Sequence, residues 1–277
     1  MSQDLLPIEN LFYQAFNQHP SLAEAAHEIT EEILKTSELD FKKYQACIEE
    51  IIDALETYGI KKHTQNDEPH YHNRQHTKEV LLSVSLLLNQ QENNILENTG
   101  RDFSLWPPFS AHEKLLLIIA ALGHDYLHPG GNNRKESEFE LQSAVAIEDI
   151  MKKHVIPTSD CDIVRELILA TEYHKVKETH DIVSQATQDI SFIWRAKVIL
   201  SEADICASAL PIYGEVLSKN LASEWKHSGV KNSEALIAPM GRINFLRNIY
   251  FTSPYSKCLG LDKIVRDQIA YLEKELM

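Results

Sequence analysis

The stretch AHEKLLLIIAALGHDYLHPGGNN, residues 111–133, decides which kind of fold this chain forms. The helix predicted over residues 113–122 is apolar on every side from Leu115 onward, so it has to be buried. This helix runs directly into His124 and Asp125, and a loop rich in glycine and asparagine follows over residues 129–137. The sequence therefore predicts a buried helix that carries an imidazole and a carboxylate to its C-terminal end.

Helical periodicity continues on both sides of this stretch. Residues 21–58 predict two amphipathic helices, and residues 73–88 predict a helix with one apolar face. A polar loop is expected over residues 89–111. We expect Ser137 and Glu140 to form a capping box that opens a helix to about His154. Asp160 is expected to cap a helix through Thr171, and further helices are expected over residues 190–209, 212–226, 233–251 and 261–276.

Composition points to one all-α domain with a compact arrangement of many helices. The chain has 277 residues but only nine glycines and ten prolines, too few for the frequent turns of a sandwich or barrel. Residues 1–65 are expected to form an N-terminal helical segment that packs on or precedes the core.

The net charge of −14 excludes one class of partner. A nucleic-acid polymer needs a basic stripe on the protein, whereas a small nucleotide can be held by bound cations. The four cysteines are scattered, which favours reduced thiols and a cytoplasmic protein. The N-terminus does not resemble a signal peptide, and the longest apolar run is too short to span a membrane.

Asp204 is the first polar residue that the helical pattern of apolar residues does not explain. It shares the apolar face of the predicted helix 190–209 with Leu200 and Ala203. A buried carboxylate is costly unless it is paired, hydrogen-bonded or bound to a metal. A salt bridge to a buried arginine or lysine, or a helix cap, is the alternative to a metal site.

Four further residues add to the indication of a metal site that Asp204 gives: His124, Asp125, His72 and His76. His72 and His76 are four residues apart at the start of a helix, which places both imidazoles close together. His124 and Asp125 alone are also consistent with an ordinary helix C-terminus, where a histidine is favoured by the dipole. Together with Asp204, these residues provide nitrogen and oxygen ligands of the kind that zinc or another transition ion takes.

Two motifs carry a resemblance to a known family. YHNRQH (71–76) and HDYLHPGGNN (124–133) resemble the paired motifs of class I cyclic nucleotide phosphodiesterases, which belong to the HD superfamily of metal-dependent phosphohydrolases. ILATEYHK (168–175) and SEADI (201–205) are similar to further segments of that family. The resemblance extends over about residues 71–251, and residues 1–65 match nothing in it. It implies that residues 66–277 form the catalytic part.

The resemblance implies hydrolysis of a 3′,5′-cyclic nucleotide to the 5′-monophosphate by a hydroxide held between two divalent metal ions. The first ion would be zinc and the second magnesium or manganese. The ligands of the first ion would be His76, His124, Asp125 and Asp204. Asp125 would also reach the second ion, as a carboxylate suits a hard ion that keeps its waters.

The resemblance also implies roles for residues near the ions. His72 would be the general acid that protonates the leaving O3′, and His128 would orient water. Tyr71 would lie near the metals. Glu140 would support the water network, a role that competes with the capping box. Thr171 and Glu172 stand where the family has threonine and aspartate.

Substrate binding is implied for Asn133, Phe245 and Arg242. Phe245 would stack on the base, and Arg242 stands three residues before it, where the family has a glutamine. A guanidinium offers donors only. Arg242 would therefore disfavour adenine and favour guanine or an additional phosphate.

Two other functions remain open. The first is an HD-type hydrolase of another small phosphoester, such as a nucleotide phosphatase. The second is a catalytically silent nucleotide-binding or metal-binding module. The presence of every metal ligand and of His72 argues against the silent module.

Overall fold

Helix α6 (Ala111–Gly123) is at the centre of the fold. The side chains of residues 115–122 are completely buried, as their sequence predicts. Ser110 caps the helix, because its hydroxyl accepts from the backbone N–H of Glu113 and the Glu113 side chain accepts from Ser110 N. The computed structural model describes residues 6–18, 21–34, 42–90 and 105–277.

Helices and their connections account for the architecture of the described residues, which contain no strand. The predicted all-α fold is therefore confirmed. The α-helices other than α6 are α1 (Pro7–Gln18), α2 (Leu22–Leu34), α3 (Lys42–Thr64), α4 (Arg74–Leu88), α7 (Glu138–Lys153), α8 (Thr158–Leu169), α9 (Tyr173–Ser184), α10 (Phe192–Cys206), α11 (Pro211–His227), α12 (Pro239–Arg247), α13 (Pro254–Cys258) and α14 (Leu261–Glu275), with short 3₁₀ helices η1 (Ala207–Ala209) and η2 (Ser233–Ile237).

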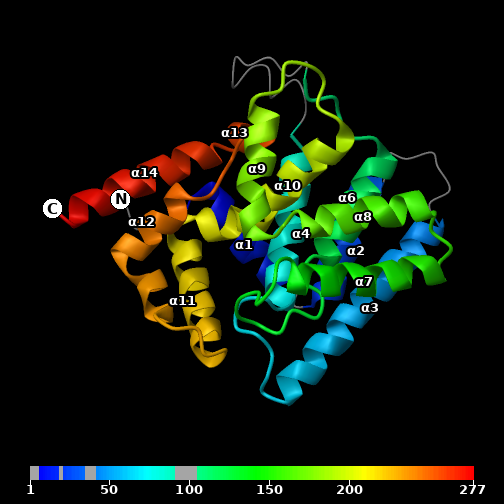
Figure 1. Ribbon diagram of the computed structural model, residues 1–277, viewed down its shortest axis with the longest axis horizontal. Coiled ribbons are helices and arrows are strands. Elements are labelled where there is room, and N and C mark those ends of the chain that lie inside the picture. Colours follow the sequence, from blue (N-terminus) through cyan, green and yellow to red (C-terminus); the bar gives the residue numbers. More distant parts are fainter. Residues whose placement is uncertain (1–5, 19–20, 35–41, 91–104) are drawn as a thin grey trace.

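Two hydrophobic clusters hold these helices together. The larger surrounds α6 and takes side chains from α2, α3, α4, α7, α8 and α10. The second joins α1 to η1, α11, α12 and α14. In Figure 1, α11, α12 and α14 lie together on one side of the molecule, away from α3, α7 and α8. Helices α4 and α10 pack against each other between the two groups.

The segment before residue 65 is built into these clusters. Leu22 of α2 and Ile51 of α3 are buried in the same cluster as Leu81 and Leu116. Phe12 of α1 is fully buried in the second cluster. Burial of this much apolar surface makes the N-terminal helices a part of the core. Helix α1 was not predicted from the sequence.

Several expected details differ in the structure. Ser137 has a left-handed backbone (φ 51°) and makes no capping bond, so the predicted capping box with Glu140 is wrong. Asp160 lies inside the first turn of α8 and binds Tyr44 and His112, so it is not the helix cap. The predicted helix 190–209 divides into α10 and η1. Helix α9 was missed because only Thr179, His180 and Val183 of its residues are buried.

Part of the loop predicted over residues 89–111 lies outside the described residues. All four cysteines are free thiols. Within the described parts of the chain, we find no helix with the length and apolar character that crossing a membrane requires.

Candidate metal centre and active site

The loop before α4 positions the first histidines of the site. Asn73 caps α4, because its Oδ1 accepts from the backbone N–H groups of Gln75 (2.8 Å) and His76 (3.2 Å). Its Nδ2 donates to the carbonyls of Pro69 and His70, both at 3.0 Å. The one side chain therefore fixes the loop that carries Tyr71 and His72 and the helical turn that carries His76.

His124 and Asp125 stand where α6 ends. His124 Nδ1 donates to the carbonyl of Ala121 at 2.8 Å. This bond places the proton on Nδ1 and leaves the lone pair on Nε2 facing the interior. The Nε2 atom is 3.2 Å from Asp125 Oδ2 and 3.4 Å from His76 Nε2.

Asp204 completes this group from the buried face of α10. Its Oδ1 lies 3.0 Å from His76 Nε2 and 3.7 Å from His124 Nε2. Asp125 Oδ2 is 3.4 Å from His76 Nε2. His76 and His124 are almost completely buried, whereas the Asp204 side chain is 25% exposed. Residues from α4, α6 and α10, distant in sequence, thus meet at one point.

The donor set fits a divalent metal ion. Atoms of His76, His124 and Asp204 that can bind a metal all lie within 4.8 Å of one another. Two imidazole nitrogens and two carboxylates converge here, and a neutral imidazole lone pair cannot donate to a carboxylate. Such a group needs either extra protons or a cation, and its nitrogen and oxygen ligands suit zinc.

The pKa values of these residues show how strongly the site attracts positive charge. Burial alone would lower the pKa of His124, but Asp125 and Asp204 raise it to about 10. Burial opposes ionisation of Asp204, but hydrogen bonds with His124 and His76 hold its pKa below the usual range. A cation at this point would replace the protons that the carboxylates otherwise hold on the imidazoles.

His72 is held by a carboxylate that we did not single out in the sequence. Its Nδ1 lies 2.5 Å from Glu224 Oε1, on α11. Glu224 Oε2 accepts from the backbone N–H groups of Tyr71 (2.8 Å) and His72 (2.9 Å). Burial of Glu224 opposes its ionisation, but His72 and these hydrogen bonds lower its pKa to about 2. An ionised Glu224 accepts only, so His72 Nδ1 carries a proton.

His128 stacks on His72, with ring centroids 3.9 Å apart. Its Nδ1 accepts from Gly130 N at 3.0 Å, so any proton of the neutral ring is on Nε2. Leu127 has a left-handed backbone (φ 68°), an unusual conformation for a residue with a Cβ that turns the chain between Asp125 and His128. Asp125, His72 and His128 form a second group able to hold a metal ion.

The glycines of the loop allow a close approach to α11. A Cβ on Gly131 would lie 2.9 Å from Ser228 Cβ, and Gly131 has a positive φ of 88°. Gly131 N donates to Glu224 Oε1 at 3.3 Å. The loop that follows His128 is therefore joined to the carboxylate that holds His72.

Asn133 and Glu140 bind each other, with Asn133 Nδ2 donating to Glu140 Oε2 at 2.8 Å. Glu172, the residue before α9, contacts the end of this loop: it accepts from the Ser137 backbone N–H at 3.0 Å and from the Ser137 hydroxyl. Tyr71 bonds Ser208 Oγ at 2.8 Å, and its ring centroid is 4.7 Å from that of His76. Tyr71 therefore lies beside the candidate metal ligands.

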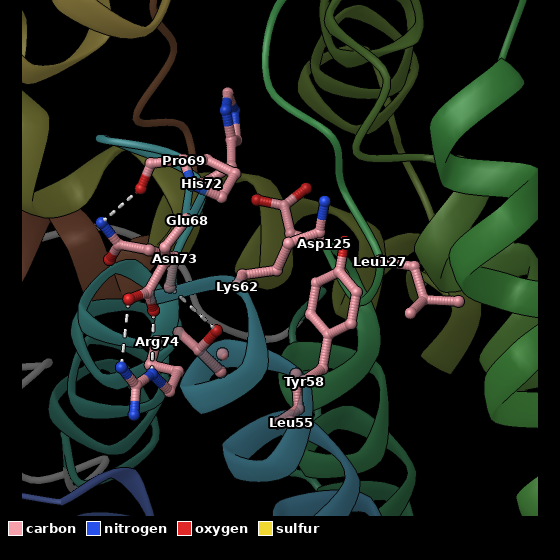
Figure 2. Close-up of a pocket in the computed structure, with 12 residues that line it drawn as sticks. Leu55, Tyr58, Lys62, Glu68, Pro69, His72, Asn73, Arg74, Asp125 and Leu127 are labelled. Atoms are coloured by element: carbon pink, nitrogen blue, oxygen red, sulfur yellow. Dashed lines mark hydrogen bonds and ion pairs between the residues drawn. The ribbon is translucent and has the colours of Figure 1, made fainter. Parts of the chain in front are cut away.

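A small cavity reaches His72 and Asp125 from the side of α3 (Figure 2). Tyr58 and Lys62 of α3 line it together with Leu127. The cavity measures about 20 Å³, which is room for about one water molecule and not for a nucleotide. Helix α3 therefore closes this side of the site.

Arg242 is hydrogen-bonded within the protein. Its guanidinium is buried and donates to the carbonyls of Ser208 (2.7 Å) and Leu210 (2.9 Å) and to Gln268 Oε1 (3.1 Å). The Phe245 ring lies against it, 5.3 Å from Arg242 Cζ. The expected contact between Arg242 and a purine base has no support here, because its donors are used within the protein.

Glu224 and Glu79 are the charged residues that the sequence interpretation missed. Tyr213, Leu217 and Glu224 follow each other at intervals of four and seven on α11, so helical spacing placed Glu224 on the buried face. Glu79 is 1% exposed, and its Oε2 lies 3.7 Å from His76 Nδ1. For both residues, the available signal in the sequence was a carboxylate at a position that helical spacing assigns to the buried face of an amphipathic helix.

Comparison with known proteins agrees with this geometry. The family described as 3′5′-cyclic nucleotide phosphodiesterase matches residues 71–158, less than half of the chain. No curated protein matches the sequence. The matched part contains His72, His76, His124, Asp125 and His128, five of the residues that the fold brings together. The segment that carries most of the candidate site is therefore similar to the family described as 3′5′-cyclic nucleotide phosphodiesterase.

Proposed function

We propose that the chain hydrolyses a 3′,5′-cyclic nucleotide to the 5′-monophosphate, with zinc at the first metal position and magnesium or manganese at the second. The observation that carries the proposal is the position of Asp125. Its carboxylate lies within 3.4 Å of His76 Nε2 and 3.2 Å of His124 Nε2, and it also belongs to the group with His72 and His128. One carboxylate thereby joins the candidate metal ligands to the candidate general acid.

The ions, when bound, would supply a water of lowered pKa as nucleophile and screen the charge of the phosphoryl group. His76, His124, Asp125 and Asp204 would hold the first ion. Asp125 is the protein ligand available to the second, which suits an ion that keeps most of its waters.

His72 would donate the proton that the leaving O3′ needs when the P–O3′ bond breaks. Glu224 accepts from Nδ1–H, so the donated proton is the one on Nε2. Burial lowers the pKa of His72, but Glu224 and Asp125 outweigh it and raise the pKa above its usual value. This shift favours the protonated form of His72, which a general acid requires.

A hydrolase of another phosphoester is the main rival. A ribose alkoxide is a poor leaving group, so a cyclic nucleotide gains more from a held imidazolium than an activated ester does. The His72–Glu224 pair thus favours the cyclic substrate. The presence of two groups of residues that could hold a metal ion argues against the silent nucleotide-binding module.

The test is a screen of the full-length protein with zinc, magnesium and manganese. Substrates are cyclic AMP, cyclic GMP, linear dinucleotides and nucleotide monophosphates. We expect metal-dependent release of a 5′-monophosphate from a cyclic nucleotide. Turnover confined to monophosphates or linear dinucleotides would favour the rival hydrolase, and nucleotide binding without turnover would favour the silent module.

A further inference from the structure

A chain of contacts connects the N-terminal helix α1 to His76. Glu9 of α1 is completely buried, and its Oε1 accepts from the backbone N–H groups of Ile212 (2.7 Å) and Tyr213 (2.9 Å). Both N–H groups lie in the first turn of α11, where the helix itself offers no acceptor, and the residue before the helix, Leu210, provides no side-chain cap. A carboxylate from α1 therefore caps α11 and complements its dipole.

Side chains of α1 also hold the ring of Tyr213. The ring centroid of Phe12 is 5.6 Å from that of Tyr213, and Tyr13 packs edge-on at 5.1 Å. Tyr213 is 6% exposed. Because both its backbone and its ring contact α1, the docking of α1 determines where the Tyr213 hydroxyl lies.

That hydroxyl donates to Glu79 Oε1 at 2.7 Å. Gln75 Nε2 is a weaker donor to the same oxygen, at 3.4 Å. The other oxygen, Oε2, is buried without a hydrogen-bond partner among the described residues. It lies 3.7 Å from His76 Nδ1. A shift of about 0.7 Å would bring this pair to hydrogen-bond length.

A buried carboxylate with one free oxygen is expensive unless it serves a second group. An imidazole that binds a metal through one nitrogen commonly donates its other N–H to a carboxylate, which fixes the ring and raises its basicity. Glu79 is placed for this contact, since Nε2 of His76 faces Asp204 and Nδ1 faces Glu79.

We infer that Tyr213 is a positioning residue for His76, acting through Glu79, and that α1 holds Tyr213 in place. The inference rests on the proposed metal site. It assigns the N-terminal helix a part in metal binding although α1 contributes no ligand. Tyr213 keeps the Glu79 carboxylate oriented, and the carboxylate orients the His76 ring.

The test is a double-mutant cycle of Tyr213→Phe and Glu79→Gln, read as Co²⁺ affinity. Full-length protein is stripped with a chelator and titrated with Co²⁺, whose visible absorption reports the ligand geometry. Each single variant should bind Co²⁺ about 10–100-fold more weakly and show an altered spectrum. The double variant should bind no more weakly than Glu79→Gln alone, because Tyr213 acts through Glu79.

Two further variants complete the design. Tyr13→Phe removes a hydroxyl from the neighbouring ring and should bind Co²⁺ as the wild type does. Glu9→Gln weakens the contact of α1 with α11 and should lower Co²⁺ affinity, with no further loss in the Tyr213→Phe background. Circular dichroism of the metal-free proteins checks folding. If Glu79→Gln does not fold, Glu79→Asp takes its place in the cycle.

The inference would be overturned if Tyr213→Phe bound Co²⁺ with wild-type affinity. It would also be overturned if Tyr213→Phe reduced Co²⁺ affinity by the same factor in the wild type and in the Glu79→Gln variant. Both results leave the proposed metal site intact. Co²⁺ binding that is as tight in Asp204→Asn as in the wild type would overturn the proposed site together with this inference.

Discussion

At the residue scale, two stacked imidazoles have opposite protonation preferences. Glu224 and Asp125 outweigh burial and raise the pKa of His72, whereas burial and the neighbouring His72 lower the pKa of His128 to about 3. The site therefore favours the neutral form of His128 and the charged form of His72. Groups whose environments separate their pKa values in this way can take different roles in acid–base chemistry.

Replacing His72 should separate proton donation from metal binding. We expect His72→Asn to retain its metal ions and to lower turnover of a cyclic nucleotide by about 10²–10⁴-fold. The loss should be smaller for a nitrophenyl phosphodiester, whose leaving group needs no proton. Elemental analysis and steady-state rates on both substrates provide the measurement. Equal losses on the two substrates would contradict the role of general acid.

Glu224→Gln should move the pH dependence of the reaction. The variant loses the carboxylate that raises the pKa of His72, so that pKa falls. A general acid has to be protonated, so activity is lost as the pH rises through its pKa. The alkaline limb of kcat/KM should therefore shift to lower pH in Glu224→Gln. An unchanged alkaline limb would show that the pKa of another group controls the loss of activity at high pH.

His180 should make the stability of the fold depend on pH. Its Nε2 lies 3.0 Å from Ser201 Oγ and its Nδ1 2.7 Å from Thr252 Oγ1. Burial lowers its pKa to about 4, against about 6.5 in the unfolded chain.

Between these pKa values the unfolded chain binds more protons, so stability should fall as the pH falls. His180 should contribute a slope of about 1.4 kcal/mol per pH unit there. Denaturant unfolding of wild type and His180→Gln between pH 4 and 6.5 measures the difference in slope. Parallel curves would mean that His180 does not titrate differently on folding.

At the scale of elements, the junction of α10, η1 and α11 is held by α12 and α14. Arg242 of α12 donates to the carbonyls of Ser208 and Leu210, and Gln268 of α14 donates to the carbonyl of Ala209 at 2.6 Å. These carbonyls follow directly after α10, which carries Asp204. The two side chains therefore stabilise the end of the helix that provides a metal ligand.

Arg242→Gln should accordingly destabilise the fold without changing base preference. We expect a loss of about 2–4 kcal/mol, because buried carbonyls lose charged donors. Arg247→Gln on the same helix is the control: its ion pair with Glu273 is exposed, so its loss should cost less than about 1 kcal/mol. Denaturant unfolding and the ratio of kcat/KM for cyclic AMP and cyclic GMP provide the measurements. A changed ratio at unchanged stability would place Arg242 near the base.

At the scale of the whole molecule, the candidate metal ligands join three helices. His76 is on α4, His124 and Asp125 follow α6, and Asp204 is on α10. An ion that binds only the folded chain stabilises it by mass action, by about 2.7 kcal/mol at a hundred times its dissociation constant. The ion would also remove the repulsion between the two carboxylates.

We therefore expect chelator treatment to lower the Tm and added Zn²⁺ to restore it. The Tm of Asp204→Asn should respond much less to either treatment. Thermal unfolding followed by circular dichroism, with and without Zn²⁺, measures both proteins. A Zn²⁺ effect of the same size in Asp204→Asn would place the stabilising ion elsewhere.

The sequence by itself determined the helical fold class, because the 3.6-residue period of apolar residues is a local property of the chain. It also identified His72, His76, His124, Asp125 and Asp204 as candidates, since polar residues stand out in apolar segments and short motifs preserve their spacing.

Only the tertiary structure decided which side chains meet. Glu224 is 152 residues from His72, and Glu9 is 204 residues from the Tyr213 N–H that it accepts from. No local pattern encodes such pairs, because they depend on how helices pack. For the same reason Arg242, which the sequence suggested for the base, proved to be bonded to the backbone at the end of α10 and η1.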